Sequence, residues 1–559
     1  MFLHSLVIEN FRGIRNARLD FDDITVFIGE NDSGKSSLFD AISRALVSTG
    51  GAPQFEAHHF HRTESGPSAA PVGPIRIELG FEERSVGEWD KLELGVLKPL
   101  LEKTASRPRR LVLRVNAEVP ADSRPVAGQW VIFSPGLKQN ADDLPALDML
   151  RSLNRFLWLR GGALFNSCIG ESRPTVEAPP LPADIAPLAK EIETHYEALV
   201  SGTTRHEKSE LKAGYEAALE LLSRRAVQSH TAGALSGSLV EEILGRRGLD
   251  AGQREQAFHG SAAQQVGVLL LTAAILRQHP GKPLSGSESL MVLDDPEVHL
   301  HLMTLASVWG VVEQLPAQKI ISTQSGTLLA AMPLHSLRRL TRRDGVVRQW
   351  RVGRNSLNAE ELRKLAYHVR VRRADASFAR CWLLVEGETE FWILPELARL
   401  CGYDLALEGI ACVEFAQSGL APLIKLAREL GIEWHVLADG DKAGRSYSDT
   451  ARAFLHGEHV RQRVTSLRQR DIEHCFWKNG YAQVFIKAAR LSLSPGDRTQ
   501  PRSVINRAIK RHSKPQMAFE LIVAVAADGS TGVPEPLRRM LDTCVQLARK
   551  GVEDRPARP

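Results

Sequence analysis

The sequence has few cysteines, few aromatic residues and no long hydrophobic run. Its six cysteines form no CxxC pair and no His/Cys cluster, which argues against a zinc site or a disulfide framework. The longest apolar run lies near Val268–Leu276, too short for a membrane span of roughly 20 residues. The N-terminus lacks the basic and apolar segments of a signal peptide. We therefore expect a cytoplasmic protein with no membrane partner.

The sequence also lacks a strong excess of charge of either sign, because 71 Lys and Arg residues stand against 66 Asp and Glu residues and leave a net charge of +5. With 25% charged and 43% hydrophobic residues, the composition excludes a wholly disordered, collagenous or coiled-coil chain. The positive charge is nevertheless concentrated. Residues 337–373 hold twelve Lys or Arg and three acids, and residues 461–514 hold thirteen and three. Such segments suit nucleic-acid phosphates, although solvated surfaces can have the same composition.

Strand and helix patterns alternate along most of the 559 residues, which predicts an α/β protein with parallel sheets. Residues 135–180 look loop-rich, residues 185–225 have a helical period, and residues 337–373 look like a basic linker or strap. The expected strands are Phe2–Glu9, Asp23–Ile28, Ile75–Phe81, Leu111–Val119, Leu290–Asp294, Lys319–Thr323, Trp382–Glu386, Ala411–Phe415 and Trp434–Ala438. The expected helices are Ser36–Leu46, Ala262–Leu276, Leu300–Gln314, Glu390–Leu400 and Ala421–Leu430.

The first chemical motif is Gly-Glu-Asn-Asp-Ser-Gly-Lys-Ser at residues 29–36, which fits the phosphate-binding pattern G-x-x-x-x-G-K-[ST] between a strand and a helix. Glycines allow the tight loop, and the backbone N–H groups of the loop and the helix start face phosphate. Lys35 would reach the β- and γ-phosphates, and Ser36 would bind Mg²⁺. A chance match in a Gly/Ser loop is the alternative. The residues expected to bind nucleotide are Gly29, Asn31, Gly34, Lys35, Ser36, Ser37, Ser261 and Asp294.

A partner motif follows about 260 residues later, where the apolar run Leu290-Met-Val-Leu ends in Asp294 and Asp295. Asp294 would hold Mg²⁺, and Asp295 would stand where a general base orients the attacking water. A capped turn after a core strand is the alternative for this pair alone.

These motifs resemble the ABC-class ATPases, in the branch with the repair and SMC-like ATPases. Phe11-Arg12-Gly13 and the stretch Asp294-Asp295-Pro-Glu297-Val-His299-Leu-His301 contribute to the resemblance. The class carries its signature motif near Gly260–Gly267, which implies that Ser261 contacts the ATP of an opposite subunit. Two departures concern hydrolysis rather than binding: Asp295 replaces the usual Glu, and Gln324 replaces the usual switch histidine.

The second motif is a set of acids after two apolar strands. Leu383-Leu-Val-Glu386-Gly-Glu388-Thr-Glu390 follows one strand, and Asp439-Gly-Asp441 follows the next strand but one. Carboxyl ends of parallel strands are where open sheets bind ligands, so these acids would converge. Mg²⁺ would remove their repulsion, and two ions about 4 Å apart are the usual device for phosphodiester cleavage. The alternatives are helix N-terminal acids and a simple turn.

Glu386, Asp439 and Asp441 match the pattern of a Toprim domain, and the additional Glu390 resembles its nuclease branch. The resemblance implies catalysis by Glu386, Glu390, Asp439 and Asp441, with two Mg²⁺ or Mn²⁺ ions bound by these four. Asp471 and Glu473 would assist in metal binding, and Lys514 would stabilise the charge that develops on phosphate. Each of the last three could also be an ordinary solvated side chain.

The order of the two halves resembles the OLD (overcoming lysogenization defect) family of ATP-linked endonucleases. The resemblance implies ATP binding, metal-dependent DNA cleavage, a homodimer, a role in phage defence or DNA repair, and in some members a separate UvrD-type helicase. The expected division is an ABC-type ATPase at 1–180 and 231–370, the latter with a basic connector, a helical dimerisation insert at 181–230 and a Toprim nuclease domain at 371–559. A non-cutting repair ATPase and a topoisomerase are the alternatives; the latter needs a catalytic tyrosine, and none of the six Tyr lies in an evident DNA-binding domain.

Overall fold

A computed structural model describes most of the chain in two compact units. The N-terminal unit contains Met1–Met332 and Ser336–Gln349, and the C-terminal unit contains Pro333–His335 and the chain from Trp350 onward. The described residues are 1–46, 53–62, 71–160 (without 93, 102–105, 121–123, 138–139 and 143), 186–200, 212, 215, 218–219, 288–298, 309–353 (without 311 and 316), 356–371, 374–491 and 500–550.

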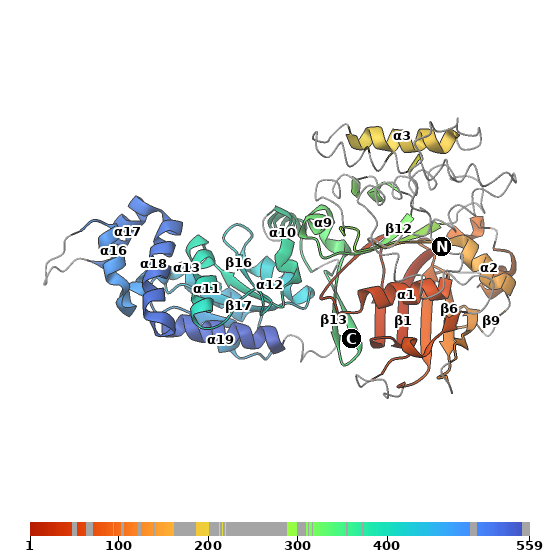
Figure 1. The fold of residues 1–559 in the computed structure, drawn as a ribbon, viewed down its shortest axis with the longest axis horizontal. Coiled ribbons are helices and arrows are strands. Elements are labelled where there is room, and N and C mark those ends of the chain that lie inside the picture. Colours follow the sequence, from red (N-terminus) through yellow and green to blue (C-terminus); the bar gives the residue numbers. More distant parts are fainter. Residues whose placement is uncertain are drawn as a thin grey trace, which may run out of the picture. The chain divides into compact units, whose positions relative to one another are not determined.

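The N-terminal unit is built on one large mixed sheet (Figure 1). Its described strands lie in the order β10 (Asn154–Arg160), β11 (Glu288–Asp294), β12 (Ala317–Ser322), β3 (Ile24–Ile28), β13 (Leu337–Arg343), β14 (Val346–Arg351), β2 (Ile14–Asp20), β1 (Phe2–Phe11), β5 (Ile75–Glu82), β6 (Arg110–Ala117), β8 (Gln129–Phe133) and β9 (Asn140–Ala141). The pairs from β10 to β3, and β3 with β13, are parallel, whereas the pairs from β2 to β9 are antiparallel. The carboxyl ends of β11, β12 and β3 therefore meet at one edge.

Helix α1 (Lys35–Leu46) covers the sheet beside β1 and β5. Its apolar residues recur at helical spacing, so Leu38, Phe39 and Ile42 are fully buried in the core. In a strand, side chains that face one side recur every second residue, and Leu6 and Ile8 of β1 face that core. This packing holds α1 against the sheet, so that only residues 29–34 connect the end of β3 to the start of α1.

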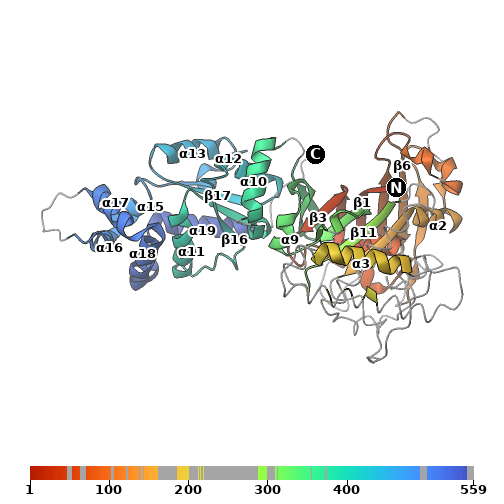
Figure 2. The same cartoon turned by 90° about the horizontal axis from the view of Figure 1, so that it is seen from above.

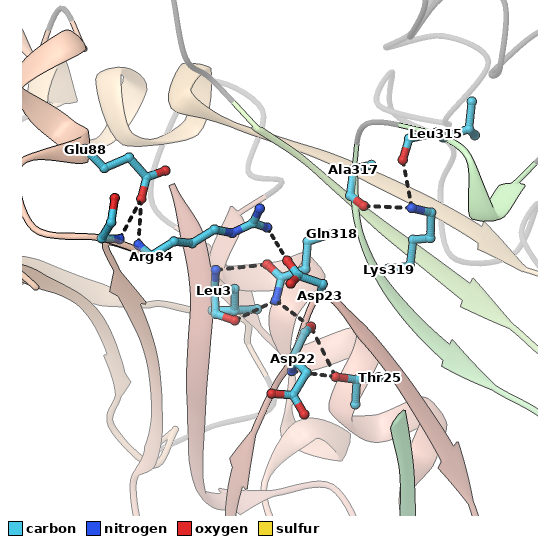
Figure 3. A network of polar contacts seen from close by, with 11 residues as sticks. Leu3, Asp22, Asp23, Thr25, Arg84, Glu88, Leu315, Ala317, Gln318 and Lys319 are labelled. Atoms are coloured by element: carbon cyan, nitrogen blue, oxygen red, sulfur yellow. Dashed lines mark hydrogen bonds and ion pairs between the residues drawn. The ribbon is translucent and has the colours of Figure 1, made fainter. Parts of the chain in front are cut away.

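A polar network joins the first strand of the chain to the parallel part of the sheet (Figure 3). Gln318 in β12 is 1% exposed; its Nε2 donates to the Leu3 carbonyl oxygen at 2.7 Å, and its Oε1 accepts from the Leu3 amide at 2.9 Å. Lys319 donates to the carbonyl oxygens of Leu315 and Ala317. The buried side chains of Gln318 and Lys319 thus both have hydrogen-bond partners, as burial requires.

Most expected strands of this unit are present within a few residues of their predicted bounds, but two expectations are wrong. Residues 135–180 include helix α2 (Leu144–Leu153) and strand β10, because Pro145 in the first turn is compatible with a helix although it resembles loop punctuation. The basic linker expected at 337–373 begins instead with β13 and β14 in the sheet. Arg338 in β13 is 1% exposed and pairs with Asp22, so its charge is buried rather than solvated.

Several sequence predictions lie wholly or largely outside the described residues. They concern Ser261, the helices expected at Ala262–Leu276 and Leu300–Gln314, and most of the helical arm at 185–225. Helix α3 (Ala186–Val200) is the main described part of that arm.

The C-terminal unit contains a parallel sheet in the order β16 (Ile410–Glu414), β15 (Cys381–Val385), β17 (Glu433–Ala438) and β18 (Val464–Ser466). Figure 2 shows α12 (Leu420–Glu429) and α13 (Lys442–Arg452) on one face, with α11 (Glu388–Leu400) and α19 (Glu535–Lys550) on the other. β15 and β17 are neighbours although β16 lies between them in sequence. This crossover brings together the two strand ends that carry the acidic motifs.

A group of helices follows the sheet: α15 (Ile472–Phe476), α16 (Ala482–Ala488), α17 (Pro501–His512) and α18 (Lys514–Asp528), before α19. Their apolar faces form one core with the sheet, and α11 packs against α18. Among the described residues, no single helix combines the length and apolar composition of a membrane span, although Lys514–Gly532 and Glu535–Lys550, bent by 74°, do so as a pair.

Candidate nucleotide site and carboxylate centre

The loop at residues 29–36 joins the end of β3 to the start of α1, as the phosphate-binding motif requires. Gly29 has a φ of 149°, and a Cβ there would lie 2.6 Å from the carbonyl oxygen of Leu340 in β13. Gly34 has a φ of 97°, a conformation that side chains rarely adopt. The backbone therefore demands glycine at both motif positions. Of the other predicted residues, Asn31 and Ser36 are exposed and Ser37 is half-buried.

Lys35 is held inside its own loop and is 4% exposed. Its Nζ donates to the carbonyl oxygens of Gly29 at 2.7 Å and Glu30 at 2.8 Å. Burial lowers the pKa of Lys35 from 10.5, while Asp295 and Asp294 oppose this shift, in that order of strength. The loop lysine and the two acids, distant in sequence, therefore share one electrostatic environment.

Ser322, at the end of β12, joins the two acids at the carboxyl end of β11. Its Oγ lies 2.7 Å from Asp294 Oδ1 and 3.0 Å from Asp295 Oδ1, and it accepts a hydrogen bond from the Asp295 amide at 2.9 Å. Asp294 is 5% exposed and Asp295 is half-buried. Sequence reasoning did not assign Ser322 a role, but its place at the end of the neighbouring strand could have indicated one.

Asp295 has a φ of 48°, in the left-handed region where Asp and Asn are the most tolerated non-glycine residues. Two residues later, Glu297 accepts a hydrogen bond of 2.6 Å from the Gln324 amide. Burial, with a smaller contribution from Asp295, raises the pKa of Glu297. Gln324, the residue at the switch-histidine position, is thus hydrogen-bonded through its amide to the carboxylate of Glu297, two residues after the predicted base Asp295.

Two arginines beside the loop were not assigned to the site from the sequence. Arg12, in the Phe-Arg-Gly motif, pairs with Asp40 of α1 at 3.0 Å. Arg342 of β13 lies 3.5 Å from Asp32 and donates to the carbonyl oxygen of Gly13. Both cations lie near the loop, where phosphate charge would be balanced.

In the C-terminal unit, Glu386 directly follows β15 and Asp439 directly follows β17. The two strands pair in parallel, so their carboxyl ends point the same way. Asp441 begins α13, and its Oδ1 accepts from the Gly444 amide at 2.8 Å. These three acids of the predicted motif therefore meet at one edge of the sheet.

The glycines of this motif have a packing role. A Cβ at Gly440 would lie 2.7 Å from the Leu467 carbonyl oxygen and would overlap that of Gln469, and one at Gly444 would overlap the backbone of Asp439. The Asp-Gly-Asp turn is thus clamped between α13 and the segment that follows β18, which fixes both carboxylates.

The remaining acids come from helix starts. Glu390, in the first turn of α11, is 8% exposed, and Glu473, in the first turn of α15, is 5% exposed. Thr389 Oγ1 donates to Glu473 Oε1 at 3.1 Å, which joins the two helices. Burial raises the pKa of Glu386, Glu390 and Glu473, and the charge of Lys514, at the start of α18, opposes each of these shifts. The acids of the strand ends and of the helix starts therefore share one electrostatic environment with Lys514.

Burial and mutual repulsion make the ionised cluster costly. Burial first, then Glu390 and Asp471, raise the pKa of Asp439 from 3.8 to about 8. Burial first, then Glu473, raises the pKa of Glu390 from 4.5 to about 7. Acids that share a site and hold such values are typical of functional centres, because a bound cation removes the repulsion.

Two further residues adjoin the centre. His474 Nδ1 lies 2.5 Å from Asp471 Oδ1, which also caps α15 through the His474 amide at 2.9 Å. Burial, then Glu386 and Asp441, raise the pKa of Tyr447 in α13. Their positions follow from tertiary packing, and the sequence offered no clear signal for either.

The donor set fits hard divalent cations, since it consists of carboxylates, the ligands that Mg²⁺ and Mn²⁺ favour. Within the described parts of both units, no three His, Cys, Asp or Glu side chains are already arranged to hold a metal ion. Carboxylates repel one another when no cation lies between them. Glu386, Glu390, Asp439 and Asp441 would hold metal, with Asp471 and Glu473 beside them.

Comparison with known proteins relates the two parts of the chain to different family models. A family model described as "Protein of unknown function (DUF2813)" matches residues 1–376, and one described as "Overcoming lysogenization defect protein-like, TOPRIM domain" matches residues 378–441. The uncharacterized protein YbjD of Escherichia coli is 33% identical, over 98% of this chain and 99% of its own. The DNA replication and repair protein RecF of Rickettsia bellii is 50% identical over 44 residues, which are 8% of this chain and 12% of RecF.

Solved structures show weaker similarity. The C-terminal region of the Burkholderia pseudomallei OLD protein covers 31% of this chain and 99% of its own, with 18% identity and a TM-score of 0.26. The SMC head domain from Thermotoga maritima covers 63% of this chain and 100% of its own, with 14% identity and a TM-score of 0.32. The predicted relationship to OLD proteins is confirmed by the family model of the Toprim domain. The chain belongs to the DUF2813 family and carries an OLD-like Toprim domain in its C-terminal unit.

Proposed function

We propose that the chain is an ATP-binding, divalent-metal-dependent DNA endonuclease that acts in phage defence or DNA repair. The observation that supports it best is the convergence of acids from β15, β17 and α11 beside Lys514, with the pKa of Asp439 raised to about 8. A sheet edge that crowds acids without a cation is costly. A bound cation would offset this cost, which gives a physical reason for so many acids at one sheet edge.

Glu386, Glu390, Asp439 and Asp441 bind two Mg²⁺ or Mn²⁺ ions in this proposal. When bound, such ions supply Lewis acidity for water activation and leaving-group stabilisation. The Gly440 clamp fixes the direction of the two aspartates, and Lys514 places positive charge where the phosphate becomes more negative. DNA is the substrate class, because it combines a phosphodiester with a polyanionic backbone.

ATP binding at Gly29, Gly34, Lys35 and Ser36, with Asp294 toward Mg²⁺, regulates cleavage in this proposal. Phosphate oxygens would take the place of the carbonyl oxygens that Lys35 now contacts. The protein would work as a homodimer in which Ser261 contacts the partner's nucleotide, and a UvrD-type helicase would be a separate partner.

The test is cleavage of supercoiled plasmid with Mg²⁺ or Mn²⁺, with and without ATP. Wild type should produce nicked or linear DNA, and Asp439→Ala should not, while both bind ATP equally. Asp449→Ala is the matched control, because Asp449 is an exposed acid of α13 that pairs only with Arg452 at 2.9 Å among the described residues. Metal-dependent cleavage by Asp439→Ala would refute the assignment of the centre.

A non-cutting DNA-binding ATPase is the second candidate, favoured by the 44-residue similarity to RecF. In that case ATP would modulate DNA affinity, and the plasmid would stay supercoiled under every metal condition. Absence of cleavage together with ATP-dependent DNA binding would support it over the nuclease.

A further inference from the structure

The exposed face of helix α17 carries four cations and no acid. Its buried face consists of Val504, Ile505 and Ala508, which pack into the core of the C-terminal unit. At about 100° per residue, the exposed positions fill the other half of the helix circumference. Besides Ser503 and Asn506, that half contains Arg502, Arg507, Lys510 and Arg511, with no acid.

No described neighbour neutralises the four cations of this face. None of their side chains makes an ion pair or hydrogen bond with another described residue of the chain. Other exposed helix cations of the same unit are paired locally: Arg399 with Glu396, Arg452 with Asp449 and Arg539 with Glu535. Like charges along one helix face repel, so a bound anion would relieve this repulsion.

The end of α17 lies close along the chain to Lys514 of the carboxylate centre. Helix α17 ends at His512, and the next helix begins at Lys514, with only Ser513 between them. Ser513 has a φ of 65°, which turns the chain sharply at this point. Helices α17 and α18 pack together, beside α16 (Figure 1). Lys514, whose charge acts on Glu386 and Glu390, therefore lies three residues after Arg511, the last cation of that face.

We propose that the exposed face of α17 binds the phosphate backbone of duplex DNA and guides it to the carboxylate centre. The inference rests on the proposed function, because it takes DNA as the substrate. The nine residue steps from Arg502 to Arg511 span about 14 Å. A duplex carries one charge per about 3.4 Å of each strand, so the face would pass about four phosphates. Four cations match that number.

Such contacts position DNA without reading its sequence. Binding should therefore depend strongly on salt and little on base sequence. An acidic protein partner would also fit a cationic helix, but the neighbouring phosphodiester site favours DNA.

The test separates binding from cleavage by working in the Asp439→Ala background. Arg507→Gln/Lys510→Gln/Arg511→Gln would be compared with the matched control Arg399→Gln/Arg452→Gln/Arg539→Gln, which removes the same charge from exposed but paired positions. Fluorescence anisotropy with a labelled 30-bp duplex would be followed from 50 to 200 mM NaCl.

We expect the α17 variant to bind at least 10-fold more weakly at 100 mM salt. Its slope of log K against log salt should fall by about 2 to 3, at roughly 0.9 per lost phosphate contact. The control should stay within twofold of its parent. Arg507→Lys/Arg511→Lys should retain most affinity, because lysine preserves the charge. The Gln variant should keep the thermal midpoint of its parent, which separates loss of charge from misfolding.

Unchanged affinity and salt slope in the α17 variant would overturn the inference, even if wild type cuts DNA. Conversely, weakened binding in that variant with no cleavage by wild type would uphold the α17 surface and refute the proposed nuclease. Equal weakening in the variant and the control would also overturn the inference, because net charge alone would then explain binding.

Discussion

The amide of Gly440 donates a hydrogen bond of 3.0 Å to the carbonyl oxygen of Gln469, and a Cβ at position 440 would overlap that oxygen. The contact joins the turn between Asp439 and Asp441 to the segment that leads to Asp471. Three acids of the proposed metal centre are thus positioned by one glycine.

Gly440→Ala should abolish metal-dependent cleavage and lower the thermal midpoint, because the Asp-Gly-Asp turn must move away from Gln469. A shift of several degrees is expected for a loss of about 2 kcal/mol. Gly457→Ala is the control: Gly457 has a φ of 92° but no atom within 4 Å of its would-be Cβ. It should lose stability by backbone strain alone and keep cleavage. Normal cleavage by Gly440→Ala would contradict the role of the clamp.

Asp439→Asn should stabilise the metal-free protein. The pKa of Asp439 rises from 3.8 to about 8 on folding, so its charge destabilises the folded state increasingly as the pH rises from about 4 through 8. In EDTA at pH 8, the variant should melt a few degrees higher than wild type, with a smaller difference at pH 5. Added Mg²⁺ should stabilise wild type more than the variant. An equal or lower midpoint of the variant at pH 8 would argue against repulsion in the cluster, with Asp449→Asn as the control.

Asp295→Asn should slow ATP hydrolysis by about 100-fold or more while nucleotide affinity changes less than threefold. Asn tolerates the left-handed backbone at φ 48° as well as Asp does, so the loop should keep its shape. Steady-state hydrolysis and binding of a fluorescent ATP analogue measure the two effects separately. Unchanged hydrolysis would shift the role of base to another acid, of which the half-buried Glu297 is one candidate.

Motifs that depend on local spacing could be read from the sequence. The loop at residues 29–36 and the acids after β11, β15 and β17 lie where strand ends were predicted, because apolar runs that end in acid mark the carboxyl edges of parallel sheets. The family models confirm the OLD-like assignment that these motifs indicated.

Features that depend on long-range pairing could not be read in this way. β13 lies inside the sheet although its sequence is basic, because Arg338 is neutralised by Asp22, more than 300 residues earlier. The hydrogen bond from Thr389 to Glu473 likewise joins two helices that no local pattern relates. Local spacing thus predicted the residues of the candidate site, while the contacts that fix their geometry required the fold.

His435, in β17 beside the carboxylate centre, should make the C-terminal unit sensitive to acid. It is fully buried, with Nδ1 2.9 Å from the Gln462 carbonyl oxygen and Nε2 2.9 Å from Thr465 Oγ1. Burial lowers the pKa of His435 from 6.5 to about 4. The stability that the neutral ring confers is therefore complete above pH 6.5 and lost as the pH falls through 4, at most about 3 kcal/mol. His435→Gln should flatten that loss, seen as hydrogen exchange of the β17 amides between pH 7 and 4.5 after correction for intrinsic rates. The exposed His456→Gln should leave the profile unchanged, and a wild-type profile in His435→Gln would show that another group governs acid opening.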